Sequence, residues 1–148
     1  MLAISMTFLL GAIVGSFINV VTYRLPIMLK NGWIYDSSEF LKSQGFNVKG
    51  LINEPKYESL NLLWPPSHGP HCRHKIKAWE NIPLLSYFYL RRKCSNCAEE
   101  ISHRYPIIES ICAFLTMFLV YHFGVSSVSF ILMLLMWSLL TISIIDLK

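Results

Sequence analysis

The sequence begins with an apolar run that contains no charged residue between Leu2 and Val21. As an α-helix this run is about 30 Å long, which matches the hydrocarbon core of a bilayer. A cleaved signal peptide is the alternative, but it needs a cationic stretch before its apolar core, and the first cation here, Arg24, follows the run. We therefore expect residues 1–23 to form a membrane-spanning helix.

Two further apolar runs lie near the other end of the chain. Residues 105–125 include Glu109 near the start and His122 near the end, whereas residues 126–145 carry no charge. Gly124 and the serines after it separate the two runs as a short turn. The sequence thus predicts an all-α membrane protein with three transmembrane helices, the second and third of which lie in residues 105–148.

The positive charges are concentrated between the first and second apolar runs. Of 13 Lys and Arg residues, all but Lys148 lie between Arg24 and Arg104. A basic segment between apolar ends argues against a nucleic-acid-binding protein and for a cytoplasmic loop. We expect a multi-pass membrane protein with its N-terminus outside and residues 24–104 in the cytoplasm.

This loop is too long to be an unstructured connection in a compact protein, so we expect a small domain. An amphipathic stretch from about Ser37 to Gln44 predicts a helix that starts at Ser37 or Ser38 as the N-cap. The second half of the loop has few apolar residues, and small domains of that kind usually need a disulfide or a bound metal ion to be stable.

Three cysteines in the loop can supply this stabilising cross-link. Cys94 and Cys97 form a Cys-x-x-Cys pair, and 21 residues separate Cys72 from Cys94. In a reducing cytoplasm such thiols favour a tetrahedral zinc site over disulfides, so we expect a zinc-ribbon-like domain with structural zinc. His68, His71 and His74 are candidates for the fourth ligand. The alternative is that the thiols are simply reduced and bind nothing.

Polar side chains inside the apolar runs are expected to avoid lipid. Glu109 should face the helix bundle or the loop domain, where it either contacts substrate or pairs with Arg104. Ser16 and Asn19 lie three residues apart and can form polar contacts with neighbouring helices. Cys112, in the second run, is expected to be a small packing residue.

Several blocks of the sequence, in the right order along the chain, resemble the type IV prepilin peptidases. These are bifunctional leader peptidases and N-methyltransferases of type IV pilus and type II secretion systems. The matching blocks are Gly15-Ser16-Phe17-Ile18-Asn19-Val20-Val21-Thr22-Tyr23-Arg24-Leu25-Pro26, Leu60-Asn61-Leu62-Leu63-Trp64-Pro65 with Ser67-His68, Trp79 to Tyr87, Arg92-Lys93-Cys94 to Cys97, Ile101 to Glu109, and Ile145-Asp146.

The resemblance implies that Asp146 is the first of two catalytic aspartates of a membrane aspartyl protease domain that starts in residues 105–148. It also implies a prepilin or pseudopilin substrate, S-adenosylmethionine as the methyl donor, and the inner membrane of a bacterium as the location. The family's second aspartate lies in a GxGD motif, and this chain contains no Gly-x-Gly. We therefore expect a fragment, a truncated product or one half of a split enzyme, without proteolysis unless a C-terminal half supplies the second aspartate.

A second departure concerns the zinc ligands. The family carries two Cys-x-x-Cys pairs, and Gly69 stands where the first cysteine of the first pair is expected. The metal set is then Cys72, Cys94 and Cys97, with His68 or His71 as a possible substitute ligand. The alternative function is a non-catalytic, membrane-bound zinc module that interacts with prepilin or secretion-assembly partners.

Overall fold

The computed structural model describes residues 2–46, 61–62, 64, 93–94, 97 and 99–147. These residues form the helices α1 (Leu2–Ser43), α3 (Arg104–Phe123) and α4 (Ser127–Asp146), together with a β-bridge between Lys93 and Glu100. All three helices are long and apolar enough to cross a membrane, which confirms the predicted membrane helices. The zinc-ribbon-like domain falls mostly outside the described residues and stays a prediction.

The first helix is twice as long as a membrane span requires. The sequence predicts the spanning helix in residues 1–23 and a new helix from Ser37 or Ser38. Instead α1 is a single helix of 42 residues, and both serines lie inside it. The predicted N-cap is therefore wrong: the Ser38 hydroxyl donates to the carbonyl of Tyr35 within the helix, at 2.7 Å. Arg24, the first cation, marks the end of the uncharged run and not the end of the helix.

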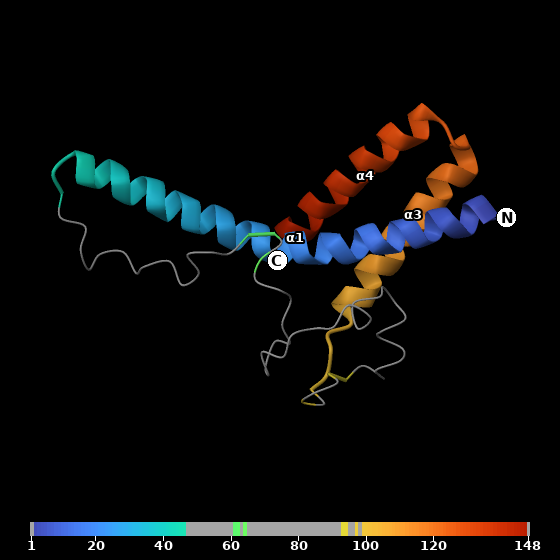
Figure 1. Ribbon diagram of the computed structural model, residues 1–148, viewed down its shortest axis with the longest axis horizontal. Coiled ribbons are helices and arrows are strands. Elements are labelled where there is room, and N and C mark those ends of the chain that lie inside the picture. The colour runs from blue at the N-terminus through green and yellow to red at the C-terminus, as the bar shows by residue number, and fades with distance from the viewer. Residues whose placement is uncertain are drawn as a thin grey trace.

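Pro26 lies inside α1 and does not end it. A proline within a helix removes one backbone hydrogen bond and crowds the preceding turn, which bends the helix. Figure 1 shows α1 bending near its middle and continuing beyond α3 and α4 as a separate rod.

A glycine cap ends α1. Gly45 has φ +84°, a conformation that glycine adopts without steric cost. The amide of Phe46 donates to the carbonyl of Leu41 at 3.1 Å, and the amide of Gly45 donates to that of Lys42 at 3.0 Å. These two bonds form a Schellman cap, which satisfies carbonyls that the last turn leaves open.

The second and third apolar runs form helices close to the predicted bounds. Gly124, with φ +65°, follows α3, and Ser126 caps the start of α4, since its hydroxyl accepts a hydrogen bond from the amide of Ser129 at 3.2 Å. Glycine and serine are suited to these two positions because one tolerates positive φ and the other supplies a side-chain acceptor. The expected turn around Gly124 is confirmed.

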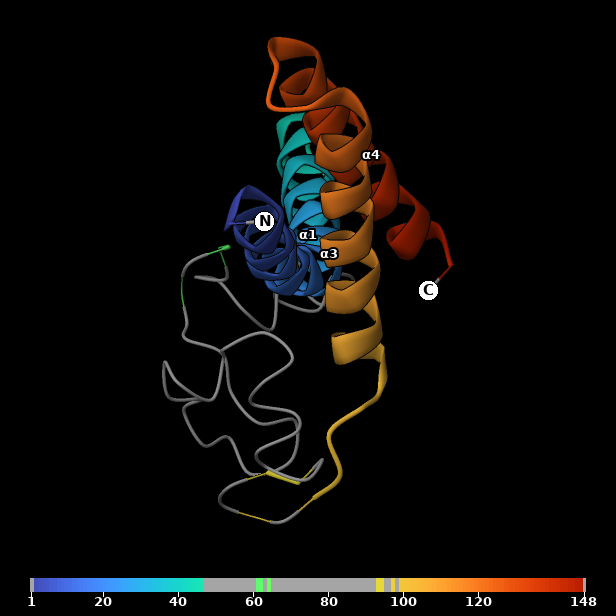
Figure 2. The same cartoon turned by 90° about the vertical axis from the view of Figure 1, so that its right-hand side faces the viewer.

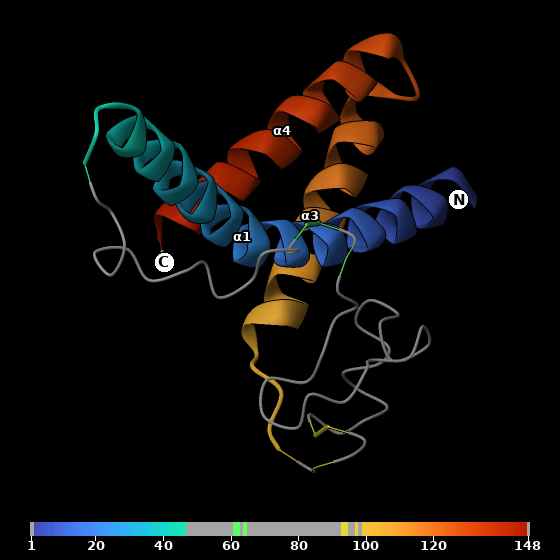
Figure 3. The ribbon, with the colours of Figure 1, turned by 60° about the vertical axis from the view of Figure 1, so that its left-hand side comes forward.

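Two glycines bring α1 and α3 into close contact. A Cβ atom added to Gly11 would lie 2.7 Å from the Cα of Ala113, and one added to Gly15 would lie 2.8 Å from the Cα of Glu109. Small residues four apart on one helix face allow such backbone approach in membrane helix pairs. Figure 2 faces the start of α1 and shows α3 between α1 and α4, and Figure 3 shows α3 passing across α1.

The small core lies where the three helices meet. It consists of Ile18 from α1, Ile108 and Cys112 from α3, and Ile144 from α4. Cys112 is fully buried in this cluster, which confirms its predicted packing role. Next to it, the indole nitrogen of Trp137 donates to the hydroxyl of Thr116 at 3.1 Å and so joins α4 to α3. The outer faces of the helices carry large exposed apolar side chains, as expected for helices surrounded by lipid.

Candidate functional site

Asp146 is the last residue of α4 and its only charged residue. The preceding turns carry no charge, so the first carboxylate of the segment falls where the helix ends. The amide of Leu147 closes this end by donating to the carbonyl of Ser143 at 3.1 Å. The side chain of Asp146 is exposed. A carboxylate is expected at the end of a membrane helix, because a charge inside the bilayer is costly.

Hydrogen bonds tie the end of α4 to the first turn of α3. The guanidinium Nη2 of Arg104 donates to the carbonyl of Ile144 at 3.2 Å. The next residue, Tyr105, accepts a hydrogen bond through its carbonyl from the side-chain amide of Asn19, also at 3.2 Å. Figure 1 shows the end of α4 returning to the middle of α1. We call this meeting point the helix junction, defined by Asn19, Arg104, Tyr105, Ile144 and Asp146.

The polar residues predicted to face other helices do so in two of three cases. Asn19 is 8% exposed and bonds α1 to α3, as expected of a polar contact between helices. Glu109 is also 8% exposed, on the part of α3 that packs against Gly15, so it avoids lipid as predicted. Its role in substrate binding or in pairing with Arg104 stays a prediction. Ser16 is half-buried.

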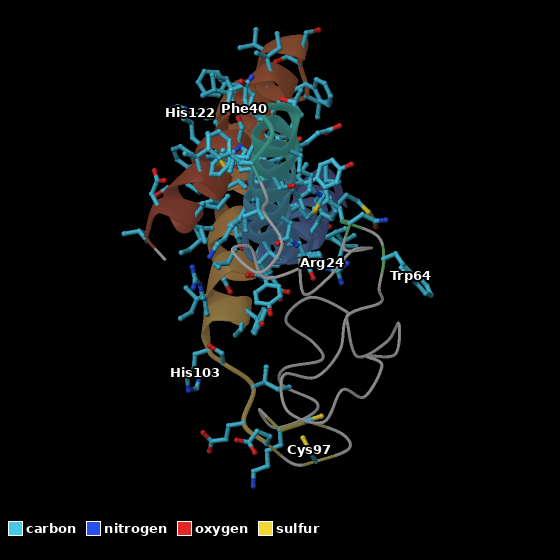
Figure 4. All side chains as sticks on the ribbon, turned by 90° about the vertical axis from the view of Figure 1, so that its left-hand side faces the viewer. Arg24, Phe40, Trp64, Cys97, His103 and His122 are labelled. Atoms are coloured by element: carbon cyan, nitrogen blue, oxygen red, sulfur yellow. The ribbon has the colours of Figure 1, made fainter. Side chains whose placement is uncertain are left out.

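Arg24 brings together two segments that are far apart in the sequence. It is 7% exposed, and its Nη1 donates to the backbone carbonyls of Asn61 at 2.9 Å and Leu62 at 3.4 Å. A buried guanidinium needs such acceptors because an unpaired charge away from water is costly. Figure 4 shows Trp64, just after this segment, pointing away from the helices. Arg24 thus fastens part of the loop to the end of the spanning portion of α1.

Cys94 and Cys97 lie in a turn between Lys93 and Glu100. The bridge between Lys93 and Glu100 closes this turn, and the amide of Cys94 donates to the carbonyl of Glu99 at 2.8 Å. Cys94 is half-buried and Cys97 is exposed. Figure 4 shows Cys97 far from the helices, beyond the segment that contains His103.

The turn provides two of the predicted zinc ligands. Cys72, His68, His71 and His74 lie outside the described residues, so the predicted ligand set cannot be assembled from the structure. Among the residues that the structure does describe, no three His, Cys, Asp or Glu side chains gather to hold a metal ion. Two thiols on a closed Cys-x-x-Cys turn are nevertheless the donor type and spacing that zinc sites use.

Four residues have contacts in this helix packing that the sequence-based predictions do not include. Gly11 and Gly15 form a Gly-x-x-x-Gly pattern, a recognisable signal for close packing of membrane helices. The contact of Arg24 with residues 61–62 is not predictable, because nothing in the sequence links these two segments. Arg104 was considered as a partner of Glu109, whereas its guanidinium also contacts α4.

Comparison with known proteins identifies the class to which this bundle belongs. The Bacterial Peptidase A24 N-terminal domain matches residues 9–123, which include most of α1, all of α3 and the segment between them. The chain therefore belongs to the bacterial A24 peptidase family, and the resemblance to prepilin peptidases is confirmed. The match ends before α4, so it does not include Asp146.

Individual relatives carry a more specific description. Proteins named prepilin leader peptidase/N-methyltransferase from Stutzerimonas stutzeri and Pseudomonas putida are 47% and 44% identical to this chain, over 137 and 143 residues. The matches cover 93% and 97% of this chain but 45% and 46% of the two relatives. The chain thus spans a little under half the length of these curated relatives. No solved structure is detectably similar to it.

Proposed function

We propose that this chain is the N-terminal part of a prepilin peptidase that cleaves the leader of type IV prepilins or pseudopilins and methylates the new N-terminus. Family membership and the names of the relatives support this function. The observation that carries it is that Asp146 ends α4 two residues after Ile144, which packs where all three apolar helices meet. A carboxylate there can reach a peptide bond at the membrane surface while its helix stays in the bilayer.

Asp146 can perform only half of the acid–base chemistry that peptide hydrolysis requires. One carboxylate must take a proton from water as the oxygen bonds to the scissile carbonyl carbon, and a second carboxyl group must protonate the leaving nitrogen as the C–N bond breaks. Two carboxyl groups that share one proton supply both roles. We assign the first position to Asp146 and expect the second aspartate on a C-terminal segment like that of the longer relatives.

The arrangement also fits the proposed orientation. Figure 1 places the N-terminus and the turn between α3 and α4 on one side, and the end of α4 on the other. The part of α1 that follows its uncharged run carries Arg24, Lys30 and Lys42 and extends toward the second side, and the positive-inside rule assigns that side to the cytoplasm. Asp146 then acts at the cytoplasmic surface of the bacterial inner membrane.

Structural zinc in the loop is the second component of the proposal. Cys94 and Cys97 would hold the ion, together with Cys72 and with His68 or His71 in place of the ligand that Gly69 lacks. Zinc would stabilise the fold of this loop and take no part in proteolysis. The closed turn that carries Cys94 and Cys97 supports this assignment because it places two thiols on one short loop.

The proposal that the enzyme methylates the cut prepilin rests on the family resemblance and on the names of the relatives. S-adenosylmethionine would supply the methyl group to the α-amine that cleavage exposes. The described residues identify no site for it, and we assign no residue of this chain to that reaction.

Cleavage of a prepilin in membranes tests the role of Asp146. The chain is co-expressed with the C-terminal portion of the Stutzerimonas stutzeri relative that follows the matched region, and leader removal is followed by the shift in prepilin mass. We expect Asp146→Asn to abolish cleavage, since an amide cannot accept the proton from water. Asp36→Asn, which changes an exposed carboxylate on α1, is the matched control and should keep full activity. Cleavage by the Asp146→Asn chain would refute the assignment.

A non-catalytic zinc module is the second candidate function, and the cysteine turn is the observation that favours it. It predicts one zinc ion per chain and stoichiometric prepilin binding, with no cleavage or methylation under any complementation. Metal analysis of the purified chain, with Cys94→Ser and Cys97→Ser as loss variants and Cys112→Ser as a control, measures the first property. A chain purified without zinc contradicts both this module and the proposed zinc ligands.

A further inference from the structure

The first turn of α3 contacts both other helices through adjacent residues. Tyr105 accepts a hydrogen bond from Asn19 of α1, and Arg104 donates one to Ile144 of α4, each at 3.2 Å. One bond joins this turn to α1 and the other joins it to α4. They link α1 to α4 through α3, at the end of the bundle that carries Asp146.

Arg104 meets a backbone group that α4 cannot satisfy by itself. Ile144 lies in the last turn of α4, where carbonyl groups have no partner within the helix. A cation is also favoured there because the C-terminal end of a helix carries partial negative charge. A hydrogen bond from a charged donor is stronger than one between neutral groups. Arg104 therefore stabilises the final turn in its helical form.

Apolar packing also fixes the last turn of α4. Ile144 is 9% exposed and packs in the core with Ile18 and Ile108. Two residues later, Asp146 is exposed and is not part of that core. The backbone of α4 is thus anchored immediately before the carboxylate.

We propose that Arg104 is a positioning residue that fixes the end of α4 and thereby sets the place of the Asp146 carboxyl group relative to α1 and α3. This inference rests on the proposed function of Asp146 as a catalytic aspartate. Arg104 acts through the backbone of Ile144 and takes no part in proton transfer. Its guanidinium can be replaced in part by another cation, but not by a neutral side chain of similar length.

Hydrogen–deuterium exchange of the full chain in lipid nanodiscs tests the contact without any need for activity. In Arg104→Met we expect the amides of residues 144–147 to exchange about tenfold faster, because the last turn loses a charged hydrogen bond. Arg104→Lys should restore part of the protection. Lys30→Met, a change at an exposed cation on α1, should leave these amides unchanged. Unchanged exchange in Arg104→Met would overturn the inference.

Cleavage kinetics in the co-expression membranes then test positioning against a purely structural role. We expect Arg104→Met to lower kcat about tenfold or more with KM for prepilin nearly unchanged, and Arg104→Lys to recover part of kcat. Full kcat in Arg104→Met, when Asp146→Asn is inactive, would overturn the inference and leave the proposed function standing. Cleavage by Asp146→Asn would refute the proposed function, whereas the exchange result would still report on the contact.

Discussion

Gly15 and Gly32 are two glycines of the same helix in opposite surroundings. A Cβ at Gly15 would lie 2.8 Å from the Cα of Glu109 and 3.0 Å from the Cβ of Cys112, whereas a Cβ at Gly32 would meet nothing within 4 Å. Because Gly15 faces backbone, α1 and α3 must separate to admit even one methyl group. The identical substitution should therefore have opposite effects at the two positions.

We predict that Gly15→Ala lowers the free energy of unfolding by about 1–3 kcal/mol through overpacking. Gly32→Ala should raise it by about 0.5–1 kcal/mol, since alanine restricts the unfolded chain and favours the helix. Thermal and denaturant unfolding in detergent micelles, followed by circular dichroism, measures both. Stabilisation by Gly15→Ala would show that α1 and α3 do not approach closely at this point.

Burial of single side chains could be predicted where lipid makes exposure costly. The positions of Asn19, Glu109 and Cys112 followed from polarity or size within an apolar run. Contacts between distant segments could not be predicted, because they depend on how the helices cross. The hydrogen bond from Arg104 to Ile144 is of this kind, so the sequence placed Asp146 at a helix end but gave no indication of what holds that end.

At the scale of elements, hydropathy located α3 and α4 well because lipid determines where their apolar faces begin and end. It does not locate the end of α1, since a helix that leaves the bilayer needs no apolar surface to continue. The cap at Gly45 ends α1, and that glycine lies beyond the first charges of the loop. Local capping residues therefore predict the end of this helix better than hydropathy does.

For the whole molecule, the decisive property is which side of the membrane each end faces. Val125 lies in the turn between α3 and α4 and is 86% exposed, and Leu147 follows α4 and is 83% exposed. We predict that a membrane-impermeant maleimide labels Val125→Cys in intact spheroplasts and labels Leu147→Cys only after the membrane is permeabilised. Peptide mass spectrometry distinguishes these sites from the native cysteines. The reverse pattern would invert the orientation and place Asp146 outside.

Because α1 is long, a small change in its tilt moves its far end by several ångströms. With 42 residues it measures about 63 Å, about twice the thickness of a bilayer core. The part beyond Arg24 is about 30 Å long, so a tilt of about 10° in the membrane would swing Ser43 through about 5 Å. Because the helix continues through the bend at Pro26, small rotations of its first half are magnified at Ser43. A change of bilayer thickness alters helix tilt, and it would therefore shift the point at which the chain leaves α1 after Ser43.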